Sequence, residues 1–158
     1  MLILARIDDR LIHGQVTVGW AKPLNANAIM VADDAGAKDE FRRALITMAA
    51  PADMEVEVLP IETAAVELKE ENLRPRKLIL LLSSPSDALR LVKDGAPIGK
   101  FNIGGLHFAP GKRKYMDALF LDERDLKAIR ELLSMGVKLE YKPLPTDTGV
   151  DVSELIRE

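Results

Sequence analysis

Short apolar runs alternate with longer segments of helical period along this chain of 158 residues, and this alternation restricts the fold more than any other feature. The runs Ala28–Ala32 and Leu78–Leu82 contain no polar residue, which predicts strands that are covered on both faces. Strands are expected at residues 2–7, 28–32, 56–59, 78–82, 101–103, 118–121 and 137–141.

Helices are expected between these strands, at residues 39–50, 61–71, 87–93, 122–135 and 152–158. The segment 39–50 places Phe41, Leu45 and Met48 on one helical face. Strand and helix alternate four or five times, which predicts an α/β fold: a doubly wound, mostly parallel, open twisted sheet of about six or seven strands with helices on both faces. The length, and the lack of a repeat or linker, predict a single domain over residues 1–158.

Composition excludes several classes of function. Lysine and arginine number 22 against 25 aspartates and glutamates, so the basic excess that binds nucleic acid is missing. The sequence has no cysteine, which excludes thiolate catalysis, and with only two histidines we expect no metal site. The longest apolar stretch, Leu78–Leu82, is far too short to cross a bilayer, so we expect a cytoplasmic protein.

Polar residues follow the expected strands, at the edge where ligands bind in doubly wound sheets. The first strand leads into residues 8–15, DDRLIHGQ, which contain His13. Asp33 and Asp34 follow the second strand, Ser83 and Ser84 the fourth. Gly104, Gly105 and His107 follow the fifth. Asp34, Ser84, Gly105 and His107 are therefore candidates for the rim of a pocket.

The first of these loops holds the densest group of reactive side chains. Arg6 and Arg10 can each bind a phosphate through two hydrogen bonds. Either Asp8 or Asp9 can hold one ring nitrogen of His13 as a donor, which leaves the other nitrogen as a nucleophile. Such a group suits reversible phosphorylation of histidine, because phosphoryl transfer depends mainly on positioning and on neutralising charge.

A helix is expected to begin at His13 or Gly14. Gly14 would let the backbone approach a ligand closely. The amides of Gln15, Val16 and Thr17 would then point toward a bound anion. From spacing alone, however, His13 is equally compatible with a solvated loop residue or a helix cap.

The other candidates have simpler structural interpretations. His107 is expected to line a pocket wall, and Trp20 to pack in the core. Asp33 and Asp34 fit a turn and helix cap better than a metal site. The glycines at 104–105 fit a tight turn, and the basic residues 112–114 fit a solvated turn, although they would also attract an acidic phospho-donor protein.

One block is specific to a known family: residues 6–16 read RIDDRLIHGQV and are followed by Trp20. This block closely resembles the N-terminal signature of IIB components in the mannose/fructose/sorbose family of the bacterial sugar phosphotransferase system (PTS). Weaker matches cover the rest of the chain: VADD at 31–34, DEFR at 39–42, AAP at 49–51, DALRL at 87–91, NIGGLHF at 102–108 and PTD at 145–147.

The resemblance implies a phosphoryl carrier that needs neither a metal nor an organic cofactor. His13 would be phosphorylated through Nδ1 by a phosphohistidine on a IIA component. It would pass the group to a sugar of the mannose, fructose, sorbose or N-acetylhexosamine class, bound by the membrane components IIC and IID. Catalytic neighbours would be Arg10, Asp9 and Arg6; Gly14, Gln15, Val16 and Asp8 would bind phosphate or support the site. Family members are commonly dimeric, and this one would associate peripherally with the membrane transporter.

Two segments depart from the family pattern, Ser83-Ser84-Pro85 and residues 114–122. Both are expected near the site or a partner surface, so neither the sugar nor the partners follow from the sequence. A regulatory phosphohistidine protein that does not transport sugar is the alternative function. A nucleotide-binding enzyme is disfavoured, because neither GxGxxG nor GxxxxGK[ST] occurs.

Overall fold

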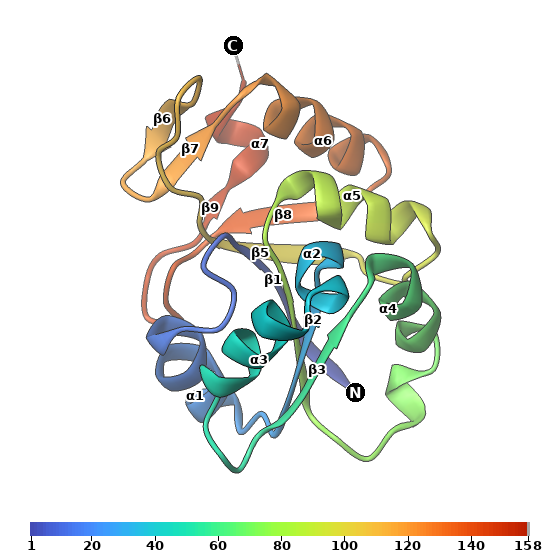
Figure 1. Cartoon of the computed structure of the whole chain (residues 1–158). Helices are drawn as coiled ribbons and strands as arrows, with labels where there is room; N and C mark the ends of the chain where they lie inside the picture. The colour runs from blue at the N-terminus through green and yellow to red at the C-terminus, as the bar shows by residue number, and fades with distance from the viewer. Residues whose placement is uncertain (158) are drawn as a thin grey trace.

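A computed structural model describes residues 1–157 and shows a seven-stranded twisted sheet (Figure 1). Its strands lie in the order β3-β2-β4-β1-β5-β8-β9, and every neighbouring pair is parallel except β8–β9. The strands are β1 (Leu2–Asp8), β2 (Ala28–Ala32), β3 (Glu55–Leu59), β4 (Leu78–Leu82), β5 (Lys100–Gly105), β8 (Lys138–Tyr141) and β9 (Val150–Asp151). This mixed, mostly parallel α/β sheet confirms the predicted fold class.

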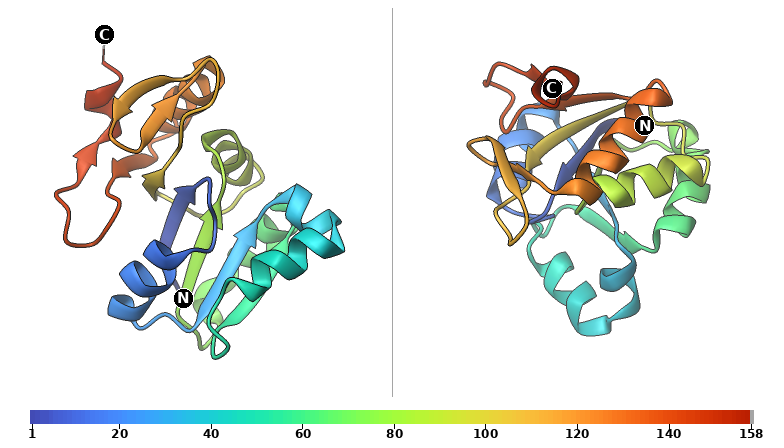
Figure 2. Two further views of the ribbon diagram at one scale, coloured as in Figure 1. Left: turned by 60° about the vertical axis from the view of Figure 1, so that its left-hand side comes forward. Right: turned by 90° about the horizontal axis from the view of Figure 1, so that it is seen from above.

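Helices cover both faces of the sheet (Figure 2). On one face the apolar residues of α4 (Ile61–Leu68), α5 (Pro85–Lys93) and α6 (Glu123–Ser134) join a large core. On the other face a smaller core receives Val16 and Trp20 from the π-helix η1 (Gln15–Ala21), which runs into α1 (Lys22–Leu24), and Ile46 from α3 (Glu40–Met48). The remaining helices are α2 (Asp34–Lys38), η2 (Glu71–Leu73) and α7 (Val152–Leu155).

The topology places a switch in the direction of the connections at the carboxyl ends of β1 and β5, which are neighbours. From β1 the chain continues to β2, toward the β3 edge of the sheet, and from β5 it continues to β8, toward the β9 edge. Ligands of doubly wound sheets bind where two such connections diverge. The loops that carry His13 and His107 follow these two strands.

Part of the secondary structure differs from expectation at the carboxyl half of the chain. Residues 119–121 form β7, which pairs antiparallel with β6 (Arg113–Met116) in a separate hairpin and meets the segment after β5 only through a bridge between Leu119 and Leu106. The basic residues Arg113 and Lys114 lie in β6, so the expected turn is wrong there. The glycines at 104–105 end strand β5 and form no turn. The predicted terminal helix spans Val152–Leu155, and residue 158 lies outside the described residues.

Helix α3 has the expected apolar stripe, but the stripe faces outward. Phe41 is 72% exposed, Leu45 52% and Met48 79%. Only the partly buried Ile46 of this helix packs against the smaller core. The periodicity was therefore sufficient to find the helix and insufficient to orient it.

Candidate functional site

The loop after β1 turns sharply before it reaches His13. Leu11 adopts a left-handed backbone (φ 56°), a conformation that costs a non-glycine residue about 1 kcal/mol. Its amide donates to the Asp8 carbonyl oxygen at 3.0 Å. Ile12, next to His13, is buried in the smaller core. Burial of Ile12 and the bond to Asp8 thus fix both sides of a short loop that presents the imidazole.

The carboxylate of Asp8 holds the imidazole of His13. Asp8 is fully buried, and its Oδ2 lies 3.1 Å from Nε2 of His13, whose side chain is 17% exposed. An ionised carboxylate only accepts hydrogen bonds, so Nε2 carries the proton in this contact. Nδ1 is then the ring nitrogen with the lone pair, and the Gln15 amide approaches it at 3.4 Å.

Two arginines bind the same carboxylate from different sides. The guanidinium of Arg6 is fully buried and donates from Nη2 to Asp8 Oδ2 at 3.1 Å. Arg10 donates from its backbone amide and from Nε to Oδ1, and its side chain is 39% exposed. Gln15 Oε1 accepts from both guanidinium groups, at 3.2 Å from Arg6 and 3.0 Å from Arg10. Arg10 is thus the partly exposed arginine of the pair, whereas Arg6 is fully buried.

These charges shift the pKa values of His13 and Asp8. Burial lowers the pKa of the His13 imidazole; attraction to Asp8 opposes this, and repulsion by Arg10 and Arg6 adds to the lowering. For Asp8, burial alone would raise the pKa, but hydrogen bonds from Arg10 and the charge of Arg6 hold it below its ordinary value. At neutral pH the site therefore contains a neutral imidazole and an ionised carboxylate.

The structure also corrects the expected position of Asp9. Its two carboxylate oxygens lie on His107: Oδ2 accepts from the backbone amide and Oδ1 lies on ring Nδ1, both at 2.7 Å. Of the two acids that could have held His13, Asp8 does so. Asp9 instead joins the His13 loop to the segment after β5. His107 is 47% exposed, so it lies at the surface and not in the wall of an enclosed pocket.

The expected cradle of backbone amides is only partly present. The amides of Val16 and Thr17 donate to the His13 carbonyl oxygen, at 2.9 and 3.0 Å, and the Val16 side chain belongs to the core. Gln15 alone directs its amide toward the imidazole. Apart from its chain neighbours and the backbone of its own helix, no atom of the described residues lies within 4 Å of where a Cβ of residue 14 would stand. A side chain at position 14 would therefore meet no other part of the described chain.

Of the remaining rim candidates, Gly105 lies at the site. A Cβ there would be 3.0 Å from His107 Cε1 and 3.3 Å from Arg10 Nη2. Asp34 accepts from the Ile61 amide at 2.9 Å and forms an ion pair with Arg90.

Residues after β2 and β4 also act as helix caps. Ser84 caps α5 by accepting from the Asp87 amide, and Asp33 caps α2 as expected. Asp34 and Ser84 therefore stabilise the neighbouring strand ends. Within residues 1–157, no hydrogen bond joins either of them to His13.

Sequence reasoning missed the residues that surround Arg6. Asn102, which is 3% exposed, accepts from Arg6 Nη1 at 2.6 Å, and the Trp20 ring lies 5.5 Å from the Arg6 Cζ. Gly104 provides the space, since a Cβ at this position would come within 1.9 Å of Arg6 Nη2. The asparagine within the apolar strand sequence FNI was the available signal. Trp20 also donates to the Pro143 carbonyl oxygen at 2.7 Å.

Metal-binding clusters and membrane-spanning helices are both absent from residues 1–157. These residues contain no group of three or more His, Asp or Glu side chains arranged to hold a metal ion. Over the same range, no helix is long and apolar enough to cross a membrane.

Comparison with known proteins identifies the family. The model of the PTS system sorbose subfamily IIB component matches residues 2–158. The sorbose-specific EIIB component of Klebsiella pneumoniae is 40% identical over 99% of this chain and 96% of that relative. The crystal structure of the IIBSor domain of the sorbose permease from Klebsiella pneumoniae superposes with a TM-score of 0.89, at 40% identity, over 99% of this chain and 96% of that one.

A third relative carries a IIB region within a longer protein. The mannose-specific EIIAB component of Escherichia coli K12 is 36% identical over 97% of this chain, which spans 47% of that relative. The matches thus extend over nearly the whole chain in sequence and in fold. The chain belongs to the sorbose subfamily of PTS IIB components, the phosphoryl carriers of sugar phosphotransferase systems.

Proposed function

We propose that His13 is the residue that carries the phosphoryl group, and that Nδ1 is the atom that receives it. The observation that supports this most directly is the contact between Nε2 and the buried carboxylate of Asp8 at 3.1 Å. It places the proton on Nε2 and the lone pair on Nδ1, in an imidazole that burial keeps neutral at pH 7.

In the first half-reaction Nδ1 attacks the phosphorus of a phosphohistidine on a IIA component. A bond forms between Nδ1 and phosphorus while the donor's phosphorus–nitrogen bond breaks, and the donor imidazole keeps that electron pair. The His13 ring then bears positive charge with its proton still on Nε2, where the Asp8 carboxylate stabilises it. Arg10, the exposed arginine, is placed to neutralise the incoming phosphoryl oxygens.

In the second half-reaction a sugar hydroxyl oxygen attacks the same phosphorus. The bond to Nδ1 breaks, the neutral imidazole with its Nε2 proton is restored, and the hydroxyl proton is released. Transfer in this direction requires that the phosphoryl group is not held too tightly. Asp8 already binds both Arg6 and Arg10, so it reduces the positive charge available to the phosphoryl group. Partial neutralisation of this kind suits a relay.

The partners that fit this role are a IIA component as donor and membrane components IIC and IID as acceptors, with the chain acting at the cytoplasmic side of the transporter. The fused EIIAB relative supports a IIA donor. Sorbose and mannose in the relatives' names support a hexose-class sugar. These names also favour sugar transport over the purely regulatory alternative.

The test is transfer of labelled phosphate from a phosphorylated IIA component. We expect His13→Ala to accept no phosphate, while His107→Ala, which lacks the other histidine, still accepts it. Retained labelling of His13→Ala would contradict the proposal. Circular dichroism of both variants checks that the fold is intact.

A further inference from the structure

A chain of buried hydrogen bonds reaches His13 from strand β5. Asn102 accepts from Arg6 Nη1 at 2.6 Å, Arg6 donates from Nη2 to Asp8 Oδ2 at 3.1 Å, and the same Oδ2 lies on His13 Nε2. Asn102, Arg6 and Asp8 are 3% exposed or less. Arg6 also donates from Nη1 to the Lys142 carbonyl oxygen at 3.3 Å and from Nη2 to Gln15 Oε1 at 3.2 Å, so a network of hydrogen bonds holds the buried guanidinium in place.

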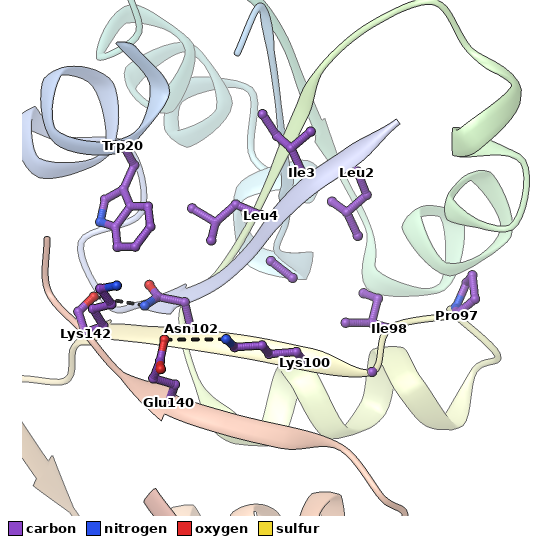
Figure 3. A pocket seen from close by; sticks show the side chains of 12 residues that line it. Leu2, Ile3, Leu4, Trp20, Pro97, Ile98, Lys100, Asn102, Glu140 and Lys142 are labelled. Carbon is purple, nitrogen blue, oxygen red and sulfur yellow. Dashed lines mark hydrogen bonds and ion pairs between the residues drawn. The ribbon is translucent and has the colours of Figure 1, made fainter. Parts of the chain in front are cut away.

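The orientation of the Asn102 amide is fixed at both ends. Its Oδ1 accepts from Arg6, and its Nδ2 donates to the Lys142 carbonyl oxygen at 2.9 Å. Asn102, Trp20 and Lys142 line a cavity of about 370 Å³, to which strands β1, β5 and β8 contribute residues (Figure 3). The asparagine thus separates the buried guanidinium from this cavity.

Gly104 constrains the same guanidinium from another direction. A Cβ at this position would come within 1.9 Å of Nη2 and 2.1 Å of Cζ of Arg6. Contact at such a distance is impossible, and the atoms approached are the centre of a fully buried, hydrogen-bonded group. Any side chain at 104 would therefore displace Arg6 from Asp8.

We propose that Asn102 is a positioning residue for phosphoryl acceptance: by holding Arg6 against Asp8, it keeps the proton of His13 on Nε2 and the lone pair on Nδ1. This inference rests on the proposed role of His13. Asn102 does not touch the reacting atoms, so its effect passes through Arg6 and Asp8. Loss of Asn102 leaves Arg6 Nη1 with only the longer bond of 3.3 Å to the Lys142 carbonyl oxygen, so the guanidinium can turn toward the cavity.

The experiment reads the His13 imidazole directly, by ¹⁵N NMR, in four variants. Asn102→Leu removes the acceptor at similar volume, and Gly104→Ala pushes on Arg6 without removing any hydrogen-bonding group. Asn102→Asp is the conservative variant, because it keeps an oxygen for Arg6. Gly99→Ala is the matched control, because, apart from its chain neighbours, no atom of the described residues lies within 4 Å of the added methyl group.

In the wild type and in Gly99→Ala we expect a neutral ring protonated on Nε2. Asn102→Leu and Gly104→Ala should both populate the other tautomer and shift the His13 pKa, because the Asp8 carboxylate that holds the Nε2 proton loses its contact with Arg6. Both should accept phosphate about 10-fold more slowly. Asn102→Asp should stay closer to the wild type than Asn102→Leu in all three measurements.

An unchanged tautomer, pKa and rate in folded Asn102→Leu and Gly104→Ala would overturn the inference. If neither variant folds, the wild type decides: the Nη protons of Arg6 should give separate, slowly exchanging signals, and a single averaged signal would overturn it. The NMR readout needs no phosphoryl transfer. If mapping shows that wild-type His13 is not phosphorylated, the proposed function fails, while the tautomer still tests what Asn102 does to the ring.

Discussion

Nε2 of His13 lies 3.1 Å from Oδ2 of Asp8, a carboxylate that is fully buried at the end of β1. This contact determines which nitrogen of the ring can act as a nucleophile. The same oxygen accepts from the buried Arg6, so the proton position at His13 is tied to the packing of the protein interior. A surface loop alone would leave the ring free to exchange tautomers.

Asp8→Asn should destabilise the protein strongly. The substitution leaves the fully buried Arg6 without a compensating charge, and removal of one partner of a buried ion pair costs about 3–5 kcal/mol. Urea unfolding measures this loss in the free energy of unfolding. Asp9→Asn is the control, because Asp9 binds the exposed His107 and should cost about 1 kcal/mol or less. Equal losses in the two variants would contradict the central place of Asp8.

Arg10→Ala should slow phosphoryl acceptance far more than it lowers stability. Its side chain is 39% exposed, so we expect a loss of about 1 kcal/mol or less in the free energy of unfolding. Loss of a donor that stabilises developing charge typically costs on the order of 100-fold in rate. Quenched time courses of phosphoryl transfer measure the rate, and melting curves measure the stability. If the transfer rate falls by no more than the fraction of folded protein does, Arg10 has no direct part in phosphoryl acceptance.

The protonation of His13 should follow a pKa below its ordinary value of 6.5, because burial disfavours the imidazolium. Between that lowered pKa and 6.5 the unfolded chain binds more protons than the folded one, so His13 makes folding less favourable as the pH falls through this window. Phosphoryl acceptance, which needs the neutral ring, should persist to a pH below 6.5. An NMR titration with a midpoint above 6.5 in the folded protein would refute this.

An ion-pair cluster far from the site offers a test of stability alone. Arg76 donates to the buried Glu71 at 2.7 and 3.0 Å, and this pairing raises the Arg76 pKa. Arg76→Ala leaves Glu71 buried without its main partner and should cost about 3–5 kcal/mol. Arg74→Ala, at a position that is 41% exposed, should cost about 1 kcal/mol or less. Neither substitution should alter the His13 tautomer, as ¹⁵N NMR of the folded variants would show.

The sequence was most informative where burial is complete. Strands β2 and β4 were predicted with their observed bounds, because uninterrupted apolar runs of five residues have few alternatives in an α/β chain. The two-residue strand β9 and the β6–β7 hairpin were missed or misplaced, since pairing between distant short segments leaves little local signal. The outward stripe on α3 shows the same limit for helix orientation.

At the site, the sequence identified the loop but not all of its contacts. Side chains point to alternate faces along a strand, so Arg6 and Asp8 share one face of β1. This two-residue alternation would have favoured Asp8 over Asp9 as the partner of His13. The bond between Asp9 and His107 depends on the register of β1 against β5, in which Asp8 pairs with Gly105. Register between distant strands is not visible in a single sequence.

Nδ1 of His13 is the atom that we propose carries the phosphoryl group. The most direct measurement incubates the wild-type chain with a phosphorylated IIA component, maps the modified residue by mass spectrometry and assigns the ring nitrogen by ³¹P and ¹⁵N NMR. We predict one added phosphoryl group, on Nδ1 of His13. A phosphoryl group on His107, on any other residue or on Nε2 of His13 would contradict the claim.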